Sequence, residues 1–321
     1  MGFPLQERSN TDPQAIMNKA YLDAVKLLLA VAPVIFRKAT FALKGGTAIN
    51  LFVQDMPRLS VDLDLVYIDH QSDRDAALAE ISAELLAIQG ELTELGFLCE
   101  MGTMTEGSEV KLFIQRERIR VKIEVNHVFR GTILPVQSRA LASNAQDIFF
   151  SDLEIPVLHE DELYGSKLVA AMDRQHPRDL FDVWMLYAHG GLTPGIVECF
   201  ICYLAGHNRP IHEVLFANEI DISSAYFNEF VGLTKEPVSL NALVEARQRL
   251  FSELPESLTE KQRQFLIGLV SGQPDWTLVS CQHMRELPAI RWKIENLSRL
   301  SKSNAKKFAQ QAAELRLRLE V

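Results

Sequence analysis

Apolar and polar residues alternate along short segments in the first half of the chain. Residues 59–67 read LSVDLDLVY, so the apolar side chains fall on one face and Ser60, Asp62 and Asp64 on the other. Alternation with a period of two predicts a half-buried strand. Similar patterns and short apolar runs predict further strands over residues 41–43, 109–114, 119–128 and 155–158.

Other segments repeat apolar residues every three or four positions, as amphipathic helices do. This spacing predicts helices over residues 13–37, 47–52, 74–95, 162–172 and 177–187. From Thr193 onward every pattern is helical, and breaks are expected at Pro210, Pro237, Pro255 and Pro274. Strands followed by helices predict an α/β or α+β catalytic domain, residues 1–155, and then a mostly helical domain, residues 156–321.

Composition narrows the function classes. The 321 residues suffice for two domains, and the net charge of -9 excludes a protein coated with basic charge for non-specific nucleic-acid binding. No apolar run approaches the roughly 20 residues of a membrane span, so no membrane partner is expected. Four cysteines and an N-terminus without a signal-like pattern predict a reduced, cytoplasmic protein.

Three carboxylates are predicted to converge on one face of the sheet. Asp62 and Asp64 are two residues apart on a strand, which places them on the same face about 7 Å apart. Glu124 has the matching polar position on a later strand. Because like charges at this distance repel, the set favours a bound Mg²⁺, or Mn²⁺, with substrate phosphates. Three such ligands are typical of metal-dependent phosphoryl or nucleotidyl transfer.

A candidate phosphate cradle precedes these carboxylates. Lys44, Gly45, Gly46 and Thr47 lie where a strand passes into a helix. Paired glycines let backbone N–H groups approach an anion closely, and the start of a helix attracts negative charge. Two further polar residues of the same region could reach phosphate oxygens: Arg58 and Ser60.

A second polar cluster falls near the predicted domain boundary. Lys167 lies among apolar neighbours in a helix, where an ammonium group needs an anion such as a nucleoside triphosphate. Arg178, Asp179 and Asp182 open the next helix. A plain ion pair between Arg178 and Asp182 is an equally good interpretation of the spacing. Cys199 and Cys202 form a CxxC in an apolar helix without further metal ligands, which favours packing.

Two basic regions could contact RNA. One region alternates basic residues along the strand that carries Glu124: Arg116, Arg118, Arg120 and Lys122. A charged edge strand explains these residues nearly as well. Residues 289–321 hold eight basic and three acidic residues, a net charge of +5, which leaves -14 for the rest of the chain.

The combined motifs resemble the AbiEii/AbiGii-type nucleotidyltransferase toxins, within the DNA-polymerase-β-like superfamily. The motifs occur in family order between residues 40 and 185: LKGGTAINLF, PRLSVDLDLVY, KIEV and DELYGSKLVAAMDRQHPRDLFD. The resemblance implies a nucleotidyltransferase core with a mixed sheet. It makes Asp62 and Asp64 metal ligands, places the triphosphate on Gly45, Gly46 and Thr47, and adds Lys167, Arg178, Asp179 and Asp182 to the nucleotide site.

The resemblance also implies a toxin of a toxin–antitoxin or abortive-infection system, with a cognate antitoxin. It implies transfer of a nucleoside monophosphate from an NTP to RNA, with the tRNA 3′ end as acceptor. In some members a Ser or Thr matching Ser60 is phosphorylated by the antitoxin. Three alternatives remain open: a protein acceptor, a small-molecule acceptor, or an inactive binding module.

Overall fold

The computed structural model describes residues 13–102 and 110–320. Within these residues the chain forms one mixed sheet of seven strands in the order β3-β4-β5-β2-β1-β7-β6. β1 pairs antiparallel with β2 and parallel with β7, and β2 pairs parallel with β5. The strands are β1 Phe41–Lys44, β2 Leu63–Tyr67, β3 Leu98–Met101, β4 Val110–Arg116, β5 Ile119–Val125, β6 Gln137–Ala140 and β7 Glu154–Val157.

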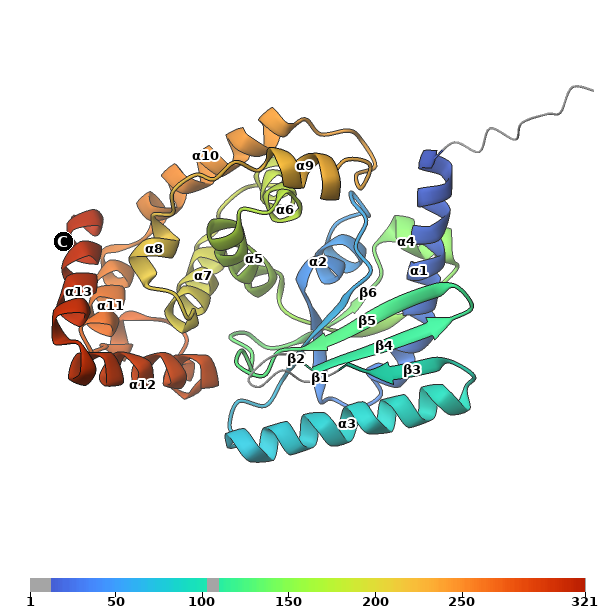
Figure 1. The fold of residues 1–321 in the computed structure, drawn as a ribbon, viewed down its shortest axis with the longest axis horizontal. Coiled ribbons are helices and arrows are strands. Elements are labelled where there is room, and N and C mark those ends of the chain that lie inside the picture. Colours follow the sequence, from blue (N-terminus) through green and yellow to red (C-terminus); the bar gives the residue numbers. More distant parts are fainter. Residues whose placement is uncertain (1–12, 103–109, 321) are drawn as a thin grey trace, which may run out of the picture.

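Helices cover the sheet, and α5 connects it to the helical part of the chain. α1 Pro13–Ile35 packs on β5 and on α3 Arg74–Glu94, which lies beneath the strands in Figure 1. The short α2 Gly45–Ala48 continues into the π-type turn η1 Ile49–Val53, and both contact α5 Glu160–Arg174. A further short helix, α4, spans Ser143–Phe149.

After β7 the described chain is helical apart from one isolated bridge. Figure 1 shows these helices curving from the top of the molecule around one side of α5. They are α6 Pro177–Ala188, α7 Pro194–Gly206, α8 Ile211–Leu215, α9 Ser223–Glu229, α10 Leu240–Ser257, α11 Glu260–Val270, α12 Pro288–Ser303 and α13 Ala305–Leu319, with single turns η2 Trp276–Leu278 and η3 Met284–Glu286. None of the helices in the described part has the length and apolar character needed to span a bilayer.

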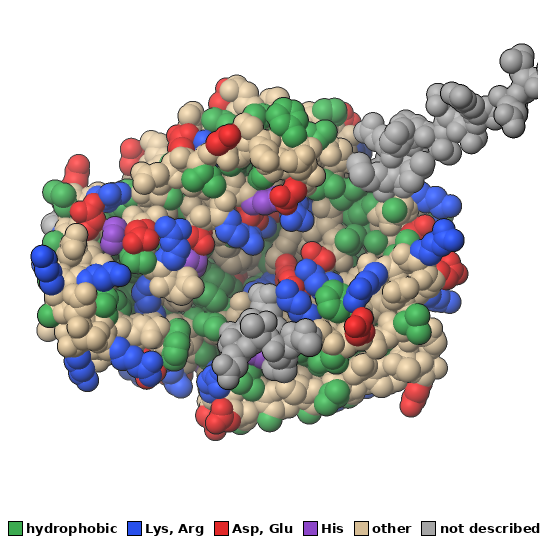
Figure 2. Space-filling view, viewed as in Figure 1, with side chains coloured by type: hydrophobic (Ala, Val, Ile, Leu, Met, Phe, Trp, Pro, Cys, Tyr) green, Lys and Arg blue, Asp and Glu red, His purple; other side chains and the backbone are tan. Residues whose placement is uncertain are grey.

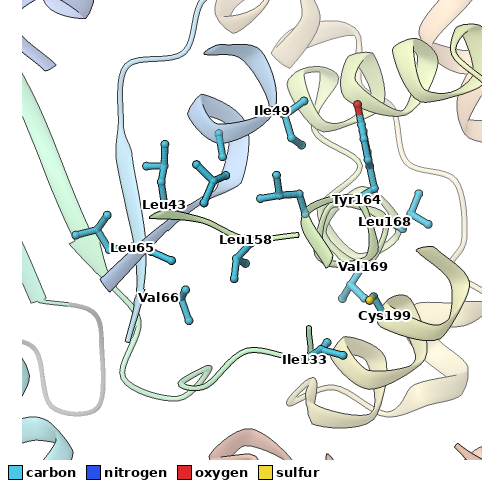
Figure 3. Packing of buried hydrophobic residues seen from close by; sticks show 14 of the residues in the cluster. Leu43, Ile49, Leu65, Val66, Ile133, Leu158, Tyr164, Leu168, Val169 and Cys199 are labelled. Atoms are coloured by element: carbon cyan, nitrogen blue, oxygen red, sulfur yellow. The ribbon is translucent and has the colours of Figure 1, made fainter. Parts of the chain in front are cut away.

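Side chains from the sheet and from α5 share one apolar core. Leu43 and Leu65 of the central strands, Leu158 after β7, and Leu168 of α5 are all fully buried (Figure 3). α7 packs on the outer side of α5 at Gly165, where a Cβ atom would lie 2.7 Å from the Phe200 nitrogen. Because this core is continuous, it holds the helices in a defined position relative to the strand ends.

The predicted order of strands before helices and the mixed sheet are confirmed. Three elements were not anticipated: β3, β6 and α4. All three are short, and neither β3 nor β6 has a fully buried residue, so their sequences carry little apolar pattern. The predicted strand over 109–114 corresponds to β4, except that Glu109 lies outside the described residues. The break expected at Pro255 is wrong, because this proline lies inside α10.

The strand predicted over residues 59–67 is also shorter than its alternation indicates. β2 begins only at Leu63, because the preceding residues pair with a distant part of the chain. Leu59 N donates to Leu233 O at 2.8 Å, and Arg58 forms an isolated antiparallel bridge with Thr234. Residues 58–62 therefore connect the sheet to the helical part of the molecule.

Candidate functional site

One row of charged residues crosses three neighbouring strands. In the strand register, Lys44 of β1 lies opposite Asp64 of β2, and Asp64 lies beside Glu124 of β5. All three line a cavity of about 390 Å³ between the sheet and α5. Figure 2 shows the molecule hollowed between the sheet and the helices, with acidic and basic side chains together at the edge.

The glycine pair packs directly against this row. Gly45 has a φ of +76°, which favours glycine, and a Cβ atom there would overlap Asp64 Oδ2. A Cβ atom at Gly46 would lie 2.6 Å from Arg58 Nη2 and 2.9 Å from Ser60 Oγ. Neither position therefore has room for a side chain, and the backbone of this turn reaches the cavity.

Gly45→Ala is expected to lower the nucleotidyl transfer that the sequence predicts by about 100-fold, since displacing a catalytic group by about 1 Å has an effect of this size. The left-handed backbone adds a loss of about 1–2 kcal/mol in stability. Gly96→Ala is the matched control, because Gly96 also has a positive φ, +86°, but open space around it. Steady-state kinetics and urea unfolding of both variants test this. Equal activity of the two would contradict the proposed role of Gly45.

A hydroxyl pair joins the glycine turn to the segment before β2. Thr47 Oγ1 lies 3.1 Å from Ser60 Oγ and donates to the Asp62 carbonyl oxygen at 2.6 Å. Asn50 links the same turn to Arg58, because its Nδ2 donates to Gly46 O at 2.8 Å and its Oδ1 accepts from Arg58 N. These bonds fix the cradle relative to the carboxylates.

The carboxylates differ in their surroundings. Burial raises the pKa of Asp64; Lys44 opposes this shift, while Glu124 and Asp62 add to it. Burial alone would raise the pKa of Glu124 as well, but hydrogen bonds from Lys111 and Lys122, at 2.8 and 3.1 Å, lower it. Asp64 is thus a partly buried carboxylate whose charged form is disfavoured, whereas Glu124 is already paired with two lysines.

This donor set fits a divalent cation through two of its three carboxylates. Asp64 is a partly buried hard-oxygen ligand with a raised pKa, and Asp62 is half exposed with Lys122 Nζ at 3.7 Å. Across the described ranges, no group of three His, Cys, Asp or Glu side chains is arranged to hold a metal ion. Glu124 would have to exchange its lysine contacts to become a third ligand.

A network of buried ion pairs joins the segment before β2 to α5 and α6. Arg58 forms a bidentate pair with Asp182, both bonds at 2.7 Å, and the two side chains are only 3% and 1% exposed. Lys167 Nζ contacts Asp179 Oδ1 at 2.8 Å and Asp182 Oδ2 at 3.0 Å. Burial would raise the pKa of Asp179, but Lys167 and Arg174 outweigh it and hold this pKa at about 2. The network joins residue 58 to α5 and α6.

Comparison with known families identifies the chain. A family model described as nucleotidyl transferase AbiEii toxin, type IV toxin–antitoxin system, matches residues 26–296. The chain belongs to the AbiEii family. It is therefore a nucleotidyltransferase toxin, and its family implies an antitoxin partner. Enzymes of this class use an NTP and a divalent metal ion.

A solved structure supports the same fold. The AbiEii-family chain resembles MenT4, a nucleotidyltransferase toxin from Mycobacterium tuberculosis H37Rv, with a TM-score of 0.57 and 19% sequence identity. The match covers 88% of this chain and 98% of the MenT4 chain. No curated protein matches the sequence. At this identity the likeness establishes the shared fold.

The structure of this AbiEii toxin places only some of the predicted site residues at the cavity, and Thr47, Ser60 and Asp62 are not among its lining residues. Lys44, Gly45, Gly46, Asp64, Glu124 and Lys167 line the cavity. Arg58 and Asp182 are buried against each other, Arg178 is exposed and does not line the cavity, and Asp179 lies behind Lys167. The anion that Lys167 needs is therefore supplied by the protein's own carboxylates. The alternative ion pair between Arg178 and Asp182 is absent from the described structure.

Further residues line the AbiEii cavity beside the predicted site residues. They are Asn126, Phe129, Asp173, Arg174, Tyr203 and His207. Asn126 shares a face with Glu124, as the alternation over residues 119–128 predicts. Tyr203 donates to Glu162 at 3.1 Å, and His207 Nε2 lies 3.5 Å from Asp173 Oδ2. These last positions come from α7 and the loop after it, and only the tertiary structure brings them to the cavity.

Proposed function

We propose that this toxin transfers a nucleoside monophosphate from an NTP to the 3′ end of an RNA, with tRNA as the acceptor and Mg²⁺ or Mn²⁺ as the cofactor. The terminal ribose hydroxyl forms a bond to the α-phosphorus, the bond to the bridging oxygen breaks, and pyrophosphate leaves. The hydroxyl proton passes to solvent. The observation that carries the proposal is the row of Lys44, Asp64 and Glu124 beside the Gly45–Gly46 turn.

Each part of the row has a separate task. The Gly45–Gly46 backbone and Lys44 would hold the triphosphate, because N–H groups and an ammonium group both bind phosphate oxygens. Asp62 and Asp64 would hold the metal ion, and Glu124 would keep Lys111 and Lys122 in place beside them. A bound divalent ion would neutralise charge on the transferred phosphate and activate the attacking hydroxyl.

The buried network would position these groups without touching the substrate. The network consists of Arg58, Lys167, Asp179 and Asp182. Its ion pairs hold Arg58 against α5 and α6 and so orient the segment that leads into Asp62. Of these four, Lys167 also reaches the cavity wall.

Basic residues near the site support an RNA acceptor. Arg120 is exposed on β5 and stacks over the Phe113 ring at 3.9 Å, while Lys122 turns toward Glu124. The basic C-terminal region forms α12 and α13, although Lys293 within it is buried and bonds to the His207 and Arg209 carbonyl oxygens. The positive charge is therefore confined to local regions of this acidic protein, where it could contact RNA phosphates.

The direct test supplies each of the four α-³²P-labelled NTPs with total cellular RNA, with Mg²⁺, Mn²⁺ or a chelator. Sequencing of RNA 3′ ends then identifies the acceptor. We expect label in small RNA, dependent on the metal ion. Label that enters protein or a small molecule instead would overturn the RNA acceptor, and no label with any acceptor would indicate an inactive binding module.

Phosphorylation of Ser60 would provide control by the antitoxin. A dianion at this hydroxyl would lie beside Thr47 and Gly46 and next to Asp62, so it would repel both the triphosphate and the metal-binding carboxylates.

Ser60→Glu, which places a negative charge there, is expected to lower transfer on the order of 100-fold. At an effective dielectric constant of about 20, like charges about 4 Å apart repel by about 4 kcal/mol, and exposure to solvent reduces this. Ser252→Glu is the control, since it adds the same charge at an exposed position of α10 that does not line the cavity. Equal activity of the two variants, measured by label incorporation, would exclude regulation by charge at Ser60.

A further inference from the structure

A second cavity adjoins the loop that follows β5. It has a volume of about 430 Å³ and lies between the start of α3, residues 127–130, and the first turns of α12. Residues of one loop serve both cavities: Asn126 and Phe129 line the catalytic one, while His127, Val128 and Arg130 line the second. The two cavities are therefore neighbours.

Positive charge dominates the lining of the second cavity. Its basic residues include three arginines, Arg74, Arg130 and Arg291. Its two acidic residues have other partners: Asp73 accepts from the Ala76 nitrogen at the start of α3, and Glu295 pairs with Arg299 on α12. Arg74 also lies 3.7 Å from Asp75, so the remaining positive charge of the lining belongs mainly to Arg130 and Arg291.

Arg130 is the most strongly constrained of these cations. It is 5% exposed; its Nη1 donates to the Arg74 carbonyl oxygen at 3.4 Å, but in the described part of the chain its Nε has no hydrogen-bond partner. His127 Nε2 is likewise buried without a partner among the described residues. Burial and then repulsion by Arg74 lower the pKa of Arg130. A buried donor left unpaired costs free energy, and an anionic ligand would satisfy it.

An aromatic side chain completes the lining. Trp292 of α12 is 47% exposed and lines the same cavity as Arg291. Nucleobases stack on exposed aromatic rings, and phosphates bind clustered arginines. The volume also lies within the range of about 300–1,000 Å³ that is typical of small-ligand pockets. A phosphate joined to a base is a ligand that uses both features.

We propose that this cavity binds one nucleotide of the acceptor RNA strand. Its phosphodiester would lie among Arg74, Arg130 and Arg291, and its base would stack on Trp292. The proposal rests on the proposed function, in which the acceptor is RNA. A strand fits better than a free nucleotide, because the shared loop lets a strand that enters one cavity continue into the other. A carboxylate of a protein partner would use the arginines and leave Trp292 without a role.

The test uses Arg291→Gln and Trp292→Ala in the full chain, since both side chains are exposed on α12 and their loss leaves the core intact. Fluorescence anisotropy measures binding of a short 5′-fluorescein-labelled single-stranded RNA over a range of KCl concentrations, and calorimetry measures ATP binding. Trp292→Ala is expected to weaken RNA binding about tenfold. Arg291→Gln is expected to lower the salt dependence by about one phosphate contact, a slope change of about 0.7. ATP affinity stays unchanged in both.

Arg249→Gln is the matched control, because it removes an exposed arginine from α10, away from this cavity. RNA affinities of the α12 variants equal to that of the control would overturn the proposal. A loss of ATP binding with intact RNA binding would also overturn it and assign the cavity to a free nucleotide. Weaker antitoxin binding with intact RNA binding would assign it to a protein partner.

Failure of the proposed function has a different signature. It appears as a wild-type enzyme that transfers no label to RNA. If the wild type does transfer label to RNA and the variants bind RNA as the control does, only the proposal for the second cavity fails.

Discussion

Asp64→Asn is expected to lower nucleotide transfer about 1,000-fold, with little change in folding. Stabilisation of transferred charge by a bound metal ion is worth several kcal/mol, and about 4 kcal/mol corresponds to this factor. Asp64 is the central residue of the row and has Lys44 and Glu124 as its neighbours on the two adjacent strands. Single-turnover transfer of labelled NTP to RNA measures the effect.

The same substitution separates catalysis from stability. Burial is the largest cause of the raised pKa of Asp64, and the charges of Glu124 and Asp62 raise it further. The charged form of Asp64 is therefore unfavourable in the folded protein. The neutral amide should therefore unfold at the same urea concentration as the wild type or at a higher one. Asp152→Asn, an exposed carboxylate outside the cavity, is the control. Transfer by Asp64→Asn at the rate of this control would refute the metal assignment.

Asp182→Ala is expected to lower the free energy of unfolding by about 3–5 kcal/mol, the usual result of removing one partner from a buried ion pair. Asp182 is 1% exposed and accepts two bonds from Arg58 and one contact from Lys167. The substitution leaves Arg58, at 3% exposure, as a buried cation that has lost its partner. Urea unfolding of the purified variant measures the loss.

Arg174→Ala provides the comparison. Arg174 bonds to Asp179 in the same network at 2.8 Å, but its side chain is 62% exposed. Exposed ion pairs contribute about 0–1 kcal/mol, so this variant should unfold close to the wild type. If Asp182→Ala is no less stable than Arg174→Ala, the network does not hold residue 58 against the helices.

The strands and helices with strong apolar periods were predictable within a few residues. β4, β5, α3, α5 and α6 all have alternating or helical burial that matches their sequences. The strands β3 and β6 were missed because their exposed or half-buried residues carry too little apolar pattern to show a period. The boundary between residues 155 and 156 stays a prediction, although the last strand, β7, ends close to it at Val157.

The candidate site was predictable where its residues are local. Alternation placed Asp64 and Glu124 on one face, and the glycine pair marked the turn beside them. Arg58 was predicted to reach phosphate oxygens, but nothing in the sequence indicated its buried pairing with Asp182, which lies 124 residues away in the chain. Lys167 was correctly seen to need an anion, but that anion belongs to α6.

The sequence by itself determined the family, the order of strands and helices, and the carboxylates and glycines of the candidate site. These features depend on periodicity and on neighbours within a few residues, which a chain displays before it folds. Only the tertiary structure decided that Lys44, Asp64 and Glu124 form one row and that Arg58 is an internal partner of Asp182. It also decided that Arg130 and Trp292 share a second cavity. Strand order and helix packing bring distant residues together, and one sequence pattern carries no record of that pairing.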